Sequence, residues 1–170
     1  MDQEIERYLN DHLAGASGAV RLIQELADKS ENTVDREFFE RLLEDVGSDR
    51  ALLQNLLTAI GAEPSAALEL AGNVSARISF MKLAWEGFKP GRLGMYEALE
   101  MLTLGIHGKF LLWRMLHEVI HWFPEWEETD FGKLEMDAIR QRDQVESYRI
   151  REGLKALVDH QRTGPPASLP

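Results

Sequence analysis

The chain has 170 residues, 44% of them hydrophobic and 28% charged, which is typical of one globular domain with a full-sized core. Its formal net charge of -10 repels phosphate backbones and anionic lipid, so we expect neither a nucleic-acid nor a membrane partner. Because the chain has no cysteine, it contains no disulfide, no thiolate metal site and no cysteine nucleophile.

The opening MDQEIERYLNDHL lacks the basic start and apolar stretch of a secretory signal, and no apolar run approaches the length of a membrane span. We therefore expect a cytoplasmic protein. The pattern predicts one domain over residues 1–162 and a disordered tail over residues 163–170, which reads TGPPASLP.

From Asp2 to about Lys29, apolar residues recur every three or four positions, which predicts an amphipathic helix. The polar KSENT stretch ends it, and Thr33 is the expected N-cap of a second helix that runs to about Ile60. Gly61 supplies the stop. The residues expected on the inward stripe of this second helix include one polar residue, Asp49. They are Phe39, Leu42, Val46, Asp49, Leu53, Leu56 and Ile60.

Residues 61–91 predict a long crossover with short helical pieces at 66–70 and up to Trp85. A third long helix is expected from Arg92 to about Trp122. The fourth is expected to begin at a cap on Thr129 or Asp130 and to run to about residue 160. Its expected inward residues are Leu134, Ala138, Gln141, Val145, Tyr148, Leu154, Leu157 and Val158.

No segment shows the alternation typical of strands, so the sequence predicts an all-α four-helix bundle with one long crossover. The opening YLNDHLAGASGA and the stretch LGIHGKFLLW at 104–113 resemble a group of uncharacterised bacterial four-helix-bundle proteins of the ferritin-like superfamily. This resemblance implies a ferritin-like fold and leaves the activity open.

Three polar residues occupy positions where an inward stripe calls for apolar ones: His12, Asp49 and His107. At about 1.5 Å of rise per residue, His12 lies level with a residue near 51 on the second helix and one near 109 on the third. Imidazole and carboxylate together suit zinc, iron or manganese, so one hypothesis is a single metal ion held by these three residues. The alternative is a buried histidine–aspartate hydrogen bond that fixes helix register.

The residues at 117–121 spell HEVIH, which matches the HExxH pattern of zinc peptidases. In that pattern His117 and His121 hold zinc and Glu118 activates water, and Glu135 or Glu146 is the candidate third ligand here. The motif lies at the end of a helix and lacks the sheet edge that aligns a peptide, so bundle-end packing is the competing interpretation.

Aromatic residues gather around the turn after the third helix, where they cap the bundle or form a dimer surface; they are Trp113, Trp122, Phe123, Trp126 and Phe131. No glycine-rich phosphate loop or nucleophile elbow occurs in the sequence. The sequence therefore favours a non-catalytic bundle that acts by self-association, as a homodimer, or by partner binding. A bundle with one core metal and a zinc hydrolase are the alternatives, and the sequence specifies no cofactor.

Overall fold

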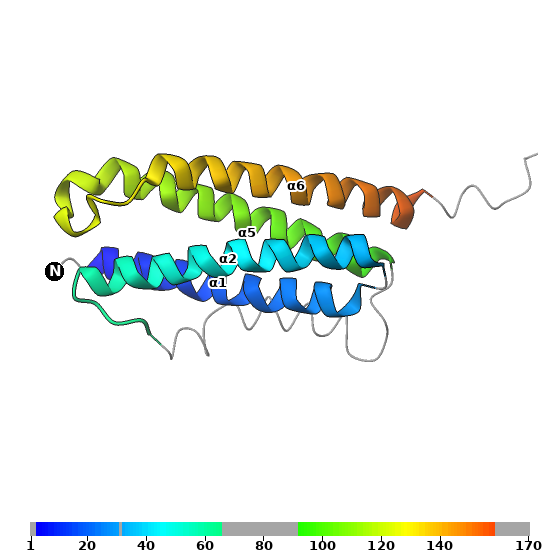
Figure 1. Cartoon of the computed structure of the whole chain (residues 1–170), viewed down its shortest axis with the longest axis horizontal. Coiled ribbons are helices and arrows are strands. Elements are labelled where there is room, and N and C mark those ends of the chain that lie inside the picture. Colours follow the sequence, from blue (N-terminus) through cyan, green and yellow to red (C-terminus); the bar gives the residue numbers. More distant parts are fainter. Residues whose placement is uncertain (1–2, 31, 66–91, 159–170) are drawn as a thin grey trace, which may run out of the picture.

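The computed structural model describes residues 3–30, 32–65 and 92–158, and within them all regular structure is helical (Figure 1). The four long helices are α1 (Gln3–Lys29), α2 (Thr33–Ala59), α5 (Arg92–Val119) and α6 (Phe131–Leu157). Two 3-10 turns, η1 (Ile120–Trp122) and η2 (Pro124–Trp126), join α5 to α6. The predicted all-α class with four long helices is confirmed for these residues. None of the described helices is long and apolar enough to cross a membrane.

The helices form two antiparallel hairpins, α1 with α2 and α5 with α6, which stack as two layers (Figure 1). Helices α2 and α5 run in the same direction, so α5 begins at the end of the bundle opposite to the one where α2 ends. The short helices predicted within the crossover, and the predicted tail, lie outside the described residues.

The core consists of two apolar clusters, one toward each end of the bundle. The first surrounds Leu13, Leu57 and Trp126, and the second surrounds Ile23 and Phe39; all five side chains are almost completely buried. Burying one such side chain stabilises the fold by about 1.5–3 kcal/mol, so the periodic apolar positions account for the assembly of the bundle.

The helix ends follow local hydrogen bonding. Asn32, rather than the predicted Thr33, caps α2 by accepting a 3.1 Å hydrogen bond from the backbone N–H of Asp35. Asp130 caps α6, as predicted for one of two candidates, and accepts from the N–H of Lys133 at 2.9 Å. Gly61 has a φ of 75° just after α2, in the left-handed region that glycine adopts without strain.

Two predictions about the α5–α6 hairpin are wrong. The α-helical part of α5 ends at Val119 instead of running to Trp122, because the chain tightens into 3-10 geometry before Pro124. The apolar residues expected to continue the inward stripe at the end of α6 are instead exposed; they are Leu154, Leu157 and Val158.

Trp126 closes the end of the bundle where α2 meets the α5–α6 connection. Its indole N–H donates a 2.9 Å hydrogen bond to the backbone carbonyl of Leu56, and its ring stacks on Phe123 at 4.2 Å. Trp113, Trp126 and Phe131 are buried, which confirms the capping role for these three aromatics. Trp122 is different, because it is 73% exposed.

Candidate functional site

A buried polar layer crosses the middle of the bundle. The ammonium group of Lys109 on α5 donates to the Asp49 carboxylate of α2 and to the Gln141 side-chain oxygen of α6. The Lys109 and Asp49 side chains are each 13% exposed, and Gln141 is buried. Because each group satisfies another, this layer fixes the register of three helices without leaving an unpaired charge inside.

Asp49 therefore points into the bundle, as predicted, but its partner is a lysine rather than a histidine. His107 is exposed and stacks on Phe110, with ring centroids 5.8 Å apart. The physical reason is helical geometry: His107 and Lys109 are two residues apart, which is about 200° of rotation, so one faces outward when the other faces inward.

His12 on α1 is half-buried and meets the ring of Tyr8 edge-on, with centroids 4.7 Å apart. Burial lowers the pKa of His12, and the negative charge of Asp11 opposes this shift only in part. Among the residues that the structure describes, no three His, Asp or Glu side chains group in a way that could hold a metal ion. Metal binding by His12, Asp49 and His107 therefore stays a prediction, without geometric support from the described chain.

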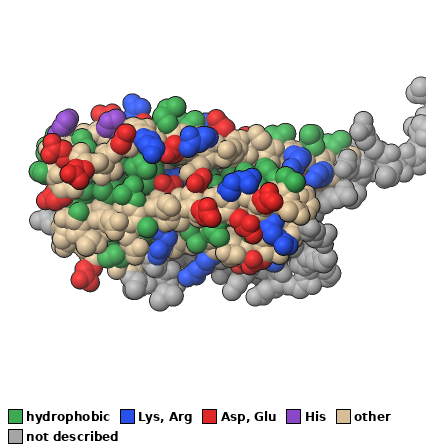
Figure 2. Space-filling view, viewed as in Figure 1, with side chains coloured by type: hydrophobic (Ala, Val, Ile, Leu, Met, Phe, Trp, Pro, Cys, Tyr) green, Lys and Arg blue, Asp and Glu red, His purple; other side chains and the backbone are tan. Residues whose placement is uncertain are grey.

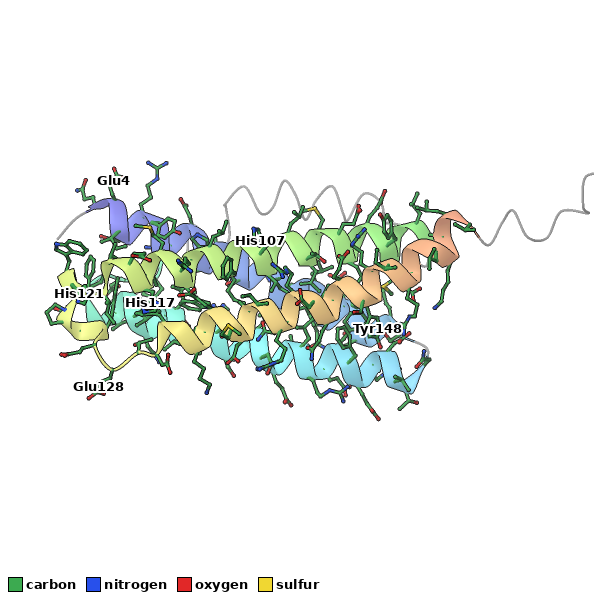
Figure 3. The ribbon with its side chains drawn as sticks, turned by 90° about the horizontal axis from the view of Figure 1, so that it is seen from above. Glu4, His107, His117, His121, Glu128 and Tyr148 are labelled. Atoms are coloured by element: carbon green, nitrogen blue, oxygen red, sulfur yellow. The ribbon has the colours of Figure 1, made fainter. Side chains whose placement is uncertain are left out.

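The HExxH segment does not form one continuous α-helical face. His117 lies in α5, but His121 follows the change to 3-10 geometry at Ile120, so the two rings lose the i, i+4 relation on which zinc binding depends. Figure 3 places both at the end of the bundle, away from His107. His117 Nδ1 lies 2.8 Å from a Glu135 carboxylate oxygen, and Glu118 pairs with Arg114 at 3.7 Å. All three side chains of the pattern are exposed, and their arrangement gives the zinc-peptidase hypothesis no geometric support.

A groove of about 360 Å³ lies between α2 and α6. Along it the Phe38 and Tyr148 rings stack at 4.0 Å, and the Tyr148 hydroxyl donates to Asp35 at 2.8 Å. The Arg151 guanidinium lies 3.9 Å from the Tyr148 ring centre and also pairs with Asp35. These contacts tie α2 to α6, so the wall of the groove is part of the packing between the two layers.

The outer side of α5 carries apolar side chains that the bundle does not cover. Leu93, Leu104, Leu111 and Met115 are between 48% and 65% exposed. At 100° per residue they fall within about 40° of arc, so they form a single line along the helix. We call these four residues the α5 outer stripe.

Helix α6 extends this apolar surface. Met136, Ile150, Leu154 and Leu157 are between 49% and 63% exposed, and Figure 2 shows apolar side chains gathered over the end of α6. Ion pairs hold the two helices together at their flanks, with Arg149 of α6 bonded to Glu100 of α5 at 3.3 Å. Among the described residues of α1 and α2, Val34 is the one large apolar side chain that is exposed to this degree.

The periodicity of the sequence did not single out this surface, because α5 is apolar on both its inner and outer sides. A signal was present: Leu104, Leu111 and Met115 repeat at helical spacing about half a turn away from the buried Leu102, Ile106 and Trp113. Comparison with models of known protein families, with curated proteins and with solved structures finds no match.

Proposed function

We propose that this chain is a non-catalytic helical bundle that binds a protein chain on the outer surface of the α5–α6 hairpin. The observation that carries the proposal is the unequal distribution of exposed apolar side chains between the two layers. Among the described residues, every large apolar side chain that is exposed, except Val34, lies on α5, η1 or α6 or directly after α6. Exposed apolar side chains concentrated on one layer in this way are typical of a protein interface.

We also propose that the bundle is ferritin-like. The directions of the four helices, with α2 parallel to α5, support this arrangement, because a ferritin-like bundle has one long crossover between its second and third helices. Ferritin-like metal enzymes use carboxylates and histidines in mid-bundle. Here the Lys109 ammonium lies at that level beside Asp49, and its positive charge disfavours a metal cation. This favours a binding role over metal chemistry.

Photo-crosslinking in cells of the source organism tests the binding role. A benzoylphenylalanine at position 111 lies in the α5 outer stripe, and one at position 34 replaces the exposed Val34 on the other layer. We expect a discrete covalent protein adduct from position 111 and none from position 34. Equal labelling at both positions, or no adduct from either, would contradict the proposed function.

A further inference from the structure

We infer that the chain bound on this surface is a second copy of the same protein, with the two α5 helices packed antiparallel across a two-fold axis between His107 and Gly108. This inference rests on the proposed function, since it names the partner of the same surface. It is carried by the register of the α5 outer stripe, the open space at Gly108, the size of the surface and its charges.

The register is self-complementary. In an antiparallel pair with its axis between residues 107 and 108, the numbers of two facing residues add up to 215. Leu104 then faces Leu111, and Met115 faces Glu100, whose carboxylate is paired with Arg149 at 3.3 Å. An isologous contact needs such a surface, because one patch must complement itself. The α5 outer stripe meets this requirement at Leu104 and Leu111, which lie on the two sides of the axis.

Gly108 lies beside the proposed axis, where a partner helix comes closest. A Cβ built on Gly108 or on Gly105 would meet nothing within 4 Å in the described part of the chain. Each glycine weakens a helix interior by about 1 kcal/mol relative to alanine, and the packing of the described residues gives no reason for either. The open position at Gly108 permits the close approach of a second helix that the proposed axis requires.

The size of the surface suits a stable dimer. At 1.5 Å per residue, the 28 residues of α5 span about 42 Å. Two adjacent helices about 10 Å apart offer a strip about 20 Å wide, hence roughly 800 Å² per chain. A specific interface of standard size buries about 800 Å² per partner. The α5–α6 surface alone is therefore large enough.

The charges distinguish a second copy from a basic partner. In the proposed register Glu97 faces Glu118, so two like-charged pairs lie at the edges of the contact. Arg114, 3.7 Å from Glu118, neutralises part of this repulsion. Added salt screens the repulsion that remains, so self-association should tighten as salt rises. Binding of a basic partner helix would weaken instead.

Sedimentation equilibrium of the purified full chain tests the inference. We expect a species of twice the chain mass at micromolar concentration. Leu111→Arg should weaken self-association by about 100-fold or more, because it places a charge in the apolar contact. Val34→Arg is the matched control on the other layer and should leave the dimer intact. Circular dichroism should show both variants folded, since both side chains are at least half exposed.

Salt provides a second readout that requires no substitution. Raising sodium chloride from 50 to 500 mM should tighten the dimer by about threefold. A chain that stays monomeric at 100 μM, or a dimer that Leu111→Arg leaves unchanged, would overturn the inference. The photo-crosslink at position 111 distinguishes failure of the homodimer from failure of the proposed binding function. An adduct with a different protein overturns the homodimer alone, whereas no adduct overturns the proposed function as well.

Discussion

Removal of the Lys109 ammonium is the sharpest test of the buried polar layer. In Lys109→Met the Asp49 carboxylate, 13% exposed, loses its cation while Gln141 loses its donor. Removing one partner of a buried pair costs about 3–5 kcal/mol when the other is fully enclosed. Because both side chains retain some contact with water, we expect the free energy of unfolding to fall by about 2–3 kcal/mol.

The double variant Asp49→Leu, Lys109→Met separates pairing from packing. It removes both charges together, so it should cost only about 1 kcal/mol, which is the penalty for leaving the buried Gln141 amide without its donor. The assay is urea unfolding followed by circular dichroism, at one protein concentration because self-association raises apparent stability. The single variants Lys109→Met and Asp49→Leu are measured beside it. A cost below about 0.5 kcal/mol for either, or a double variant whose cost equals the sum of the two, would refute the reasoning.

Three further outcomes are expected. Because burial lowers the pKa of His12, the folded protein binds fewer protons at this side chain than the unfolded chain does. Thermal stability should therefore fall as the pH drops below about 6.5. In thermal melts between pH 8 and 5, His12→Gln should remove this part of the loss of stability. A Cβ on Gly153 would lie 2.8 Å from the ring of Tyr96, whereas one on Gly15 meets open space, so Gly153→Ala should be about 2 kcal/mol less stable than Gly15→Ala by chemical denaturation; equal stabilities would contradict this. Trp126→Phe should lower the free energy of unfolding by about 2 kcal/mol, because the buried Leu56 carbonyl loses its donor and the smaller ring leaves a cavity. An unchanged urea midpoint would show that the hydrogen bond is not needed.

The helices could be predicted from the sequence because the three-to-four spacing of apolar residues reports directly which residues face the core. The bounds of α1 and α2 were predicted to within one residue. The end of α5 was not, because the change to 3-10 geometry at Ile120 depends on how the following turn packs rather than on local propensity.

The candidate site was predicted in level but not in composition. Counting along the helices placed residues near 51 on α2 and near 109 on α5 level with His12, and Lys109 does meet Asp49. His107 was predicted to occupy the inward stripe of the third helix, whereas the structure turns Lys109 inward at that level. Rise per residue gives the height of a side chain, but its rotation around the axis depends on how the helices pack.

The outer surface of α5 could not be separated from the core by pattern alone. A helix that is apolar on opposite sides predicts burial all round, and the sequence does not say which side another chain must cover. In the structure Leu104 and Leu111 are exposed and belong to neither core cluster.

A single introduced cysteine tests the proposed two-fold contact most directly, because the natural chain has no cysteine. Gly108→Cys lies beside the axis. Gly15→Cys on α1 is the matched control, since a Cβ built at either position meets no neighbouring side chain within 4 Å among the described residues. A disulfide forms only where the two Cα atoms approach to about 4.4–6.8 Å. Under mild oxidation at micromolar concentration, we predict a covalent dimer from Gly108→Cys and none from Gly15→Cys. Equal crosslinking of both variants, or none from Gly108→Cys, would contradict the account.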